Sequence, residues 1–193
     1  MRAPRLLLIT PPSGSLDDFC AALRAVSDGP GVAALLRRPG TGDRSLLAEL
    51  ARLQRCGAPV LVHRRPDLAL LGEARGVHLP ERGVTPADAR RLLGADAWIG
   101  VSRHDAAGLR EAEAADYATL SPFGAVPGKG PALGAARFAA IRRSAPDLRV
   151  LALGGIHAET ARQARDAGAD GVAVLRGADS ARRILDSMGD RKG

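Results

Sequence analysis

The chain has 193 residues, of which 46% are hydrophobic, so it is long enough for one domain with a substantial buried core. Its longest apolar runs fall far short of the roughly 20 residues that a membrane helix needs, and the N-terminal run is too short for a signal peptide, so we expect a cytoplasmic protein without a membrane partner. The formal net charge is +7, but the arginines are scattered along predicted helices and aromatic residues make up only 3% of the chain, so we expect no nucleic-acid partner.

Short apolar runs alternate with longer segments of helical periodicity, which is the pattern of parallel strands joined by crossover helices. We predict strands over residues 5–10, 31–37, 59–63, 76–79, 97–102, 116–121, 149–154 and 170–175. The predicted helices cover residues 15–27, 43–56, 66–72, 85–93, 106–114, 135–144, 157–168 and 180–188. Ser15 and Asp43 are predicted N-caps, and Thr85 precedes a proline at the first helical position.

Eight strand and helix pairs predict an α/β fold, the closed (β/α)8 TIM barrel, whose loops must be short in a chain of this length. An open doubly wound sheet is the alternative. No linker, repeat or low-complexity segment divides the chain, so residues 1–193 are predicted to form a single domain with a frayed tail at 189–193. Cys20 and Cys56 show neither metal-site spacing nor a disulfide pattern, and we expect both to be buried thiols.

The barrel fold places functional residues just after the C-terminal ends of the strands. The candidates at those positions are Thr10, Arg37, Arg38, residues 63–65, His78, residues 102–105, Ser121, Gly154, Gly155 and Arg176. All four histidines follow or end a predicted strand, so position alone does not distinguish His104 in the segment WIGVSRHD. His104 is either a proton-transfer residue or the residue at which a strand turns into a helix, with Asp105 as the cap.

Two turns that contain glycine follow the last two predicted strands, in LALGGI and VLRGADS. Glycine lets the backbone approach an anion closely, and the following helix supplies unpaired N–H groups. We predict a phosphate site formed by Gly154, Gly155, Arg176 and Gly177. The alternative is a pair of tight turns without a ligand. The loop SPFGAVPGKGPALG carries Lys129, which either closes over an anionic ligand or lies on a flexible surface.

A series of motifs resembles the thiamine phosphate synthase superfamily, which also contains the thiazole tautomerases. In chain order the motifs are LLLIT, LLRR, GVHLPE, IGVSRHD, DYATLSPFGAVPGKG, LALGGI and DGVAVL. The resemblance spans nearly the whole chain. It implies the same barrel, and a phosphate site between the turns after strands seven and eight.

The resemblance implies a metal site for one of the two activities. A thiamine phosphate synthase joins a pyrimidine diphosphate to a thiazole phosphate and uses magnesium for the departing pyrophosphate. Its motifs resemble Gln-Leu-Arg-x-Lys after strand two and Asn-Asp-Arg after strand three, and the aspartate of the latter holds the metal with a second one after GVHL. The corresponding residues here are Leu35-Leu36-Arg37-Arg38-Pro39, His63-Arg64-Arg65 and Gly83. Magnesium prefers oxygen ligands, so these residues argue against a metal, although Asp67 and Glu81 lie nearby in the sequence.

The thiazole tautomerases resemble the chain more closely. They lack the metal pair and carry a histidine two residues after the serine of the strand-five motif, as in Ser102-Arg103-His104. The resemblance therefore implies an isomerase that moves a proton in a carboxythiazole phosphate without a cofactor. His104 would be the general acid and base, because a group with a pKa of about 6.5 can take and return a proton near neutral pH. Ser102 would position the ring, and Lys129 and Arg37 would neutralise the phosphate or the carboxylate.

Two alternatives to the tautomerase stay open. The first is the synthase itself, with magnesium as its cofactor or with a diphosphate site rebuilt from arginines. The second is a barrel without catalytic activity that binds a phosphorylated ligand or a protein. The expected partner of the tautomerase is a small phosphorylated thiazole, and either a monomer or a homodimer fits the sequence.

Overall fold

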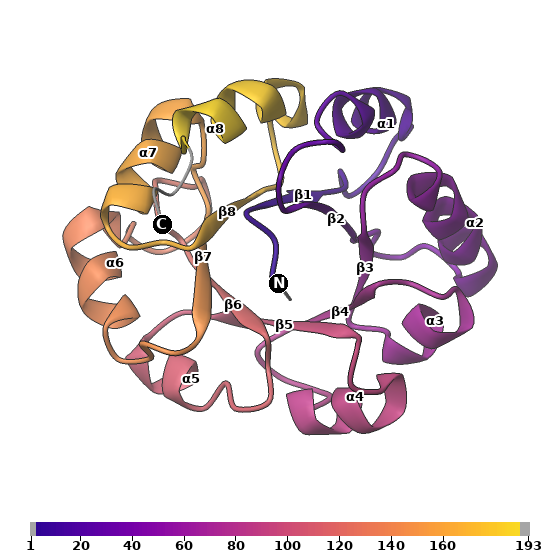
Figure 1. Ribbon diagram of the computed structural model, residues 1–193, viewed down its shortest axis with the longest axis horizontal. Helices are drawn as coiled ribbons and strands as arrows, with labels where there is room; N and C mark the ends of the chain where they lie inside the picture. Colours follow the sequence, from indigo (N-terminus) through magenta and orange to yellow (C-terminus); the bar gives the residue numbers. More distant parts are fainter. Residues whose placement is uncertain (1–2, 190–193) are drawn as a thin grey trace.

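A closed barrel of eight parallel strands forms the centre of the structure, and a ring of helices surrounds it (Figure 1). This computed structural model describes residues 3–189, so residues 190–193 of the predicted tail lie outside the described part. The first strand, β1 (Leu6–Ile9), pairs on one side with β2 (Val32–Leu36) and on the other with the last strand, β8 (Gly171–Val174). This closure confirms the predicted (β/α)8 barrel, because an open doubly wound sheet would leave two edge strands.

Each observed element lies within or close to its predicted range. The other strands are β3 (Val60–His63), β4 (Gly76–Leu79), β5 (Trp98–Arg103), β6 (Tyr117–Leu120) and β7 (Arg149–Leu153). The helices are α1 (Asp17–Arg24), α2 (Asp43–Gln54), α3 (Pro66–Leu71), α4 (Pro86–Leu93), α5 (Ala106–Arg110), α6 (Gly134–Arg142), α7 (Ala158–Asp166) and α8 (Ala181–Ser187), with a short 3-10 helix, η1 (Ala178–Ser180), before α8.

Two of the three predicted helix caps are wrong. Ser15 lies two residues before the first residue of α1, and Asp43 is itself the first residue of α2, so neither is the N-cap. An N-cap needs a non-helical backbone, and before α2 it is Gly42 that adopts the extended conformation. Thr85 caps α4 as predicted, because its Oγ1 accepts the N–H of Asp88 at 3.1 Å.

Alternate residues of each strand separate an inner core from an outer one. Leu7, Leu35 and Leu61 belong to a fully buried cluster inside the barrel. Their neighbours, such as Leu6 and Leu8, belong to a second cluster that packs against the surrounding helices. The period of two along a strand therefore accounts for both cores, and the inner one supplies an apolar floor for whatever binds at the mouth of the barrel.

Two aspartates hold the N-terminal ends of neighbouring strands in the same way. Asp116 precedes β6, and its Oδ2 accepts the N–H of Ile99 in β5 and a hydrogen bond from Arg90 in α4, both at 2.7 Å. Asp170 precedes β8 and makes the equivalent contacts to Val150 in β7 and to an arginine of α6, at 2.9 and 3.0 Å. Both carboxylates lie mostly out of solvent, so each joins two strands and one helix at the bottom of the barrel.

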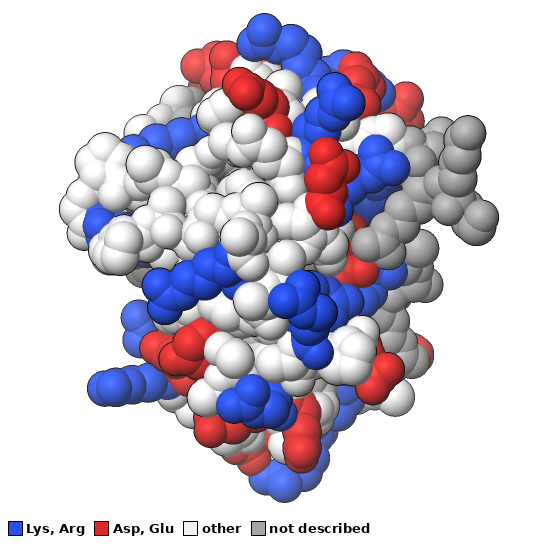
Figure 2. Space-filling view, turned by 90° about the vertical axis from the view of Figure 1, so that its left-hand side faces the viewer, with Lys and Arg blue, Asp and Glu red and all other residues white. Residues whose placement is uncertain are grey.

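The outer surface carries side chains of both charge signs. On the face shown in Figure 2, positive and negative side chains are interspersed around an area without charged groups. The arginines there do not gather into one continuous basic patch. A search of residues 3–189 finds no helix that is both long enough and apolar enough to cross a membrane.

We expect Asp116→Ala to lower the free energy of unfolding by about 3 kcal/mol, because Ile99 N–H and the Arg90 guanidinium lose their shared, largely buried acceptor. Asp28→Ala is the matched control, since the Asp28 side chain is 80% exposed and its ion pair with Arg182 contributes little. Urea denaturation followed by circular dichroism measures both variants. Equal losses would contradict the role given to Asp116.

Candidate active site

A cavity of about 580 Å³ opens at the C-terminal ends of the strands, where barrels of this type carry their active sites. Its floor is apolar and consists of Leu7, Ile9, Leu35, Leu153 and Ala173. Its polar side chains come from the strand ends and the loops that follow them. They are Arg37, His63, His78, Glu81, Ser102, His104, Thr119, Ser121, Lys129 and Arg176.

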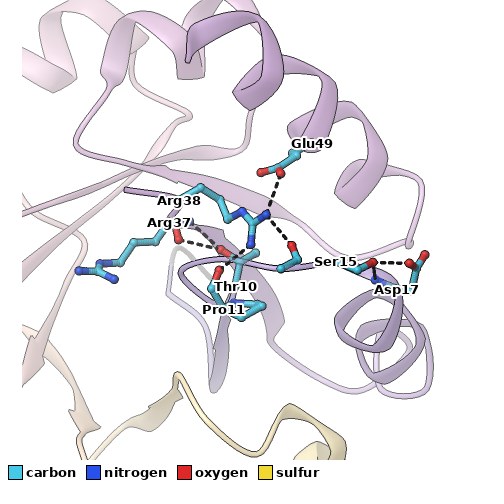
Figure 3. Close-up of polar contacts among 8 residues, drawn as sticks. Thr10, Pro11, Ser15, Asp17, Arg37, Arg38 and Glu49 are labelled. Atoms are coloured by element: carbon cyan, nitrogen blue, oxygen red, sulfur yellow. Dashed lines mark hydrogen bonds and ion pairs between the residues drawn. The ribbon is translucent and has the colours of Figure 1, made fainter. Parts of the chain in front are cut away.

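Thr10 fixes the backbone of Arg37 at the end of β2. Thr10 Oγ1 accepts the N–H of Arg37 at 2.9 Å and donates to its carbonyl oxygen at 3.1 Å. In Figure 3 the Arg37 side chain extends away from these contacts, whereas Arg38 turns toward α2 and the loop after β1. Arg38 donates to the carbonyl of Pro11 at 3.0 Å and pairs with Glu49 at 3.1 Å. Of two consecutive arginines, one therefore lines the cavity and the other holds the loop after β1 against α2.

A buried polar network lies at the base of the cavity. His78 Nδ1 is 3.1 Å from the Tyr117 hydroxyl, and His78 Nε2 is 3.1 Å from Ser102 Oγ and 3.5 Å from Thr119 Oγ1. The network requires glycine at position 100, because a Cβ there would lie 2.6 Å from His78 Nδ1. Burial is the main cause that lowers the pKa of His78 to about 3 and raises the pKa of Tyr117. His78 is therefore neutral near pH 7, and it orients Ser102 without carrying charge.

A second neutral histidine lies beside the first. The ring of His63 stacks against that of His78, with the ring centroids 6.5 Å apart and the planes inclined by 21°. Burial, followed by the positive charges of Arg37 and Arg64, lowers the pKa of His63 to about 4. The positive charge of the cavity at pH 7 thus comes from arginine and lysine, while its two deep imidazoles stay uncharged.

His104 lies at the end of β5 with its ring held by the end of β6. Its Nδ1 is 2.8 Å from the carbonyl oxygen of Ser121 and 3.3 Å from the Ser121 hydroxyl. A carbonyl oxygen only accepts, so Nδ1 carries a hydrogen, and in the neutral ring Nε2 has the lone pair. Asp105 caps α5, with its Oδ1 accepting the N–H of Gly108 at 2.8 Å. The helix start is therefore served by Asp105, and the ring of His104 lines the cavity.

The glycine turn after β7 packs against the loop after β6. Gly154 and Gly155 have φ values of 98° and 65°, and a Cβ on Gly155 would lie 2.9 Å from the backbone of Gly124. The N–H of Gly124 donates to the carbonyl of Gly154 at 2.8 Å. The same loop brings Lys129 to the cavity. The close packing against Gly124 therefore requires glycine at position 155, and the same turn also lines the cavity.

The residues that were given a role in the site all line this one cavity, with the exception of Gly177. The other candidates after the strands that do not line it are Thr10, Arg38, Arg64, Arg65, Arg103 and Asp105. Gly177 has a φ of 83° and precedes η1, so its left-handed backbone turns the chain after β8. Thr119, which is buried at the cavity wall, was not predicted as a site residue. The signal was present in DYATLS, because Tyr117, Thr119 and Ser121 occupy alternate positions and share one face of the strand.

The residues around the cavity do not form a magnesium site. Glu81 is the one carboxylate among the described residues that line it. Asp67 is instead held by Arg65 at 2.7 Å, and Arg65 also pairs with Asp43 at 2.7 Å. Between residues 3 and 189, no group of three or more His, Cys, Asp or Glu side chains could hold a metal ion. The resemblance implies a pair of aspartates for the magnesium of a synthase, and this donor set lacks that pair, because Glu81 is the one carboxylate that the described lining residues offer.

Comparisons with known proteins find relatives over nearly the whole chain. The model of the family described as thiamine monophosphate synthase (TMP-TENI) matches residues 6–178. A thiamine-phosphate synthase of Albidiferax ferrireducens is 34% identical over 190 residues, which cover 91% of this chain and 84% of the relative. One of Rhodospirillum centenum is 35% identical over 182 residues, which cover 90% of this chain and 88% of the relative. The solved thiamine phosphate pyrophosphorylase of Pyrococcus furiosus has the same fold, with a TM-score of 0.78, 24% identity and coverage of 96% and 97%.

These comparisons overturn the expectation of a thiazole tautomerase, and with it the expectation of an isomerase. The similar proteins are named synthases, which are transferases. The expectation rested largely on the missing metal carboxylates. Those residues determine how the charge of a diphosphate is balanced, and they do not by themselves determine which bond the protein makes or breaks.

The neutral state of His78 predicts that acid destabilises the fold. As the pH falls below the ordinary histidine value of 6.5, the unfolded chain takes up a proton at this residue, whereas the folded chain does so only near pH 3. Stability is therefore lost as the pH falls through this window. Between pH 7.5 and pH 5, His78 should contribute a loss of about 2 kcal/mol.

His78→Gln should show a correspondingly smaller loss between these two pH values, measured by urea denaturation at each. His157→Gln, at the exposed start of α7, is the control and should keep the dependence of the unaltered protein. A His78→Gln variant that loses as much stability as the unaltered protein would show that His78 is not the neutral buried group described above.

Proposed function

The chain belongs to the thiamine monophosphate synthase family, and on this basis we propose that it is a thiamine-phosphate synthase, a transferase that joins a pyrimidine diphosphate to a thiazole phosphate. The observation that carries the proposal is the composition of the cavity at the mouth of the barrel. It combines an apolar floor, suited to two flat rings, with a rim on which three cations face one carboxylate. Two ring compounds that each carry phosphate match this combination.

We assign the phosphate of the thiazole to the turns after β7 and β8. Gly154 and Gly155 expose their backbone to the cavity, and Arg176 adds a positive charge beside them. Barrels commonly bind phosphate between these two loops. Gly177 contributes to this part of the site only by shaping the turn, since it does not line the cavity.

We assign the diphosphate of the pyrimidine to Arg37, which follows β2, and to Lys129, in the loop after β6, because both line the cavity. In the reaction, the bond between the pyrimidine part and its diphosphate breaks, and pyrophosphate leaves with the bonding electron pair. The thiazole ring supplies the electron pair of the new bond. Negative charge on the diphosphate rises as it departs, so cations and hydrogen-bond donors placed there favour the transition state. No step is assigned to a metal ion, because the donor set does not fit one.

His104 and Ser102 act on the reacting groups from β5. With a proton on both ring nitrogens, His104 keeps its bond from Nδ1 to Ser121 and donates from Nε2 to the departing diphosphate. Ser102, held by the neutral His78, positions a ring through its hydroxyl. His104 thus remains a candidate catalytic residue, in a group transfer in place of a tautomerisation.

Incubation with the pyrimidine diphosphate and the thiazole phosphate should yield thiamine phosphate and pyrophosphate, which chromatography detects. His104→Ala should lower kcat by about 10²-fold, the usual effect of a lost proton donor, while circular dichroism shows an unchanged fold. Arg110→Ala, which removes an exposed side chain of α5 outside the cavity, serves as the control and should keep full activity.

Two outcomes would count against these assignments. If the unaltered protein forms no thiamine phosphate either with or without magnesium, it is not a synthase. If the protein forms product and His104→Ala does so at the same rate, His104 has no part in the reaction.

A further inference from the structure

The cavity carries positive charge that its own side chains do not neutralise. Arg37, Lys129 and Arg176 line it together with a single acid, Glu81. Over residues 3–189, no ion pair joins any of these three cations to a carboxylate. Unpaired cations beside an apolar floor indicate that the natural ligand brings negative charge.

Thr10 holds the backbone of Arg37, and the Arg37 side chain lines the cavity. This side chain points away from the ion pair that engages Arg38 (Figure 3). A guanidinium offers planar N–H donors that match two oxygens of a phosphate group. The cavity wall near β2 therefore offers a guanidinium that can donate hydrogen bonds to an anion.

The carboxylates near the end of β3 form ion pairs outside the cavity. Arg65 holds both Asp43 and Asp67, at 2.7 Å each, and neither aspartate lines the cavity. The residue that does line it there is His63, which is neutral because burial, Arg37 and Arg64 all lower its pKa. Magnesium needs hard oxygen ligands, and this strand end supplies an imidazole and guanidinium groups.

We propose that the cavity binds the diphosphate group of its substrate, and later the released pyrophosphate, through Arg37 and Lys129 without a divalent cation. The inference rests on the proposed function for the identity of the ligand. Two singly charged side chains supply the same charge as one magnesium ion. Lys129 lies in the loop that packs on the glycine turn after β7, so it reaches the rim from the side where the thiazole phosphate is assigned.

Isothermal titration calorimetry with sodium pyrophosphate, in EDTA and in excess MgCl₂, tests this proposal. We expect saturable binding in EDTA, and equal or weaker binding in MgCl₂, because magnesium competes with the protein for pyrophosphate. MgCl₂ alone should give no saturable binding. Pyrophosphate that binds only in the presence of magnesium would overturn the proposal.

Arg37→Gln should weaken pyrophosphate binding in EDTA about tenfold or more, because it removes a charge-assisted pair of hydrogen bonds. The backbone contacts with Thr10 do not depend on the side chain, so the variant should fold. Lys129→Gln, in a surface loop, is a second variant and should also weaken binding. Arg110→Gln removes the same charge from an exposed position in α5, outside the cavity, and should change the affinity less than about twofold.

Equal losses in Arg37→Gln and Arg110→Gln would overturn the assignment, because the effect would then come from net charge alone. Failure of this inference is distinguishable from failure of the proposed function. Thiamine phosphate formation that requires magnesium would support the function and overturn the metal-free site. Metal-free pyrophosphate binding in a protein that forms no thiamine phosphate would do the opposite.

Discussion

The pairing of β1 with β8 is the contact on which the site depends. Leu6 lies opposite Val172 and Leu8 opposite Val174, in parallel register. Without this pairing the sheet would be open, and Arg37 after β2 would be separated from Arg176 after β8 by the free edges. Closure brings the C-terminal ends of all eight strands around one cavity and places the inner apolar core beneath it.

The cavity is organised by depth, for an electrostatic reason. Burial makes charge costly at the base, so His63 and His78 are neutral there and serve through hydrogen bonds and stacking. Arginine and lysine occupy the rim, where water and ligand phosphates can solvate their charge. A substrate with a flat ring and a phosphate is therefore expected to bind with its ring inward and its phosphate at the rim.

The order of elements could be predicted from the sequence because strand and helix periods alternate so regularly. The proline after Thr85 indicated one helix start, and the rule that sites follow strands selected Arg37, Ser102 and His104. Lys129 was selected as the lysine of the loop rich in glycine and proline after β6. The predicted caps at Ser15 and Asp43 were wrong, because a cap depends on the backbone conformation of one residue, and side-chain preference alone does not determine that conformation.

Contacts between segments that lie far apart in the sequence could not be predicted from strand and helix periods. Nothing in the doublet Arg37-Arg38 indicates that the second arginine turns toward Glu49 while the first lines the cavity. The ion pair between Arg65 and Asp43 likewise depends on how α2 and α3 are placed in the barrel. The predicted reaction was wrong for a related reason, since absent metal ligands were taken as evidence about the bond that is made.

The proposed synthase combines a coupling reaction with a site that balances the charge of a diphosphate with its own cations. A crystal structure grown with thiazole phosphate, pyrophosphate and Mn²⁺ tests this most directly, because Mn²⁺ can stand in for magnesium and is located by its anomalous scattering. We predict pyrophosphate on the Arg37 guanidinium, the thiazole phosphate on the turn of Gly154 and Gly155, and no anomalous peak in the cavity. A manganese ion bridging pyrophosphate and Glu81 would contradict the account.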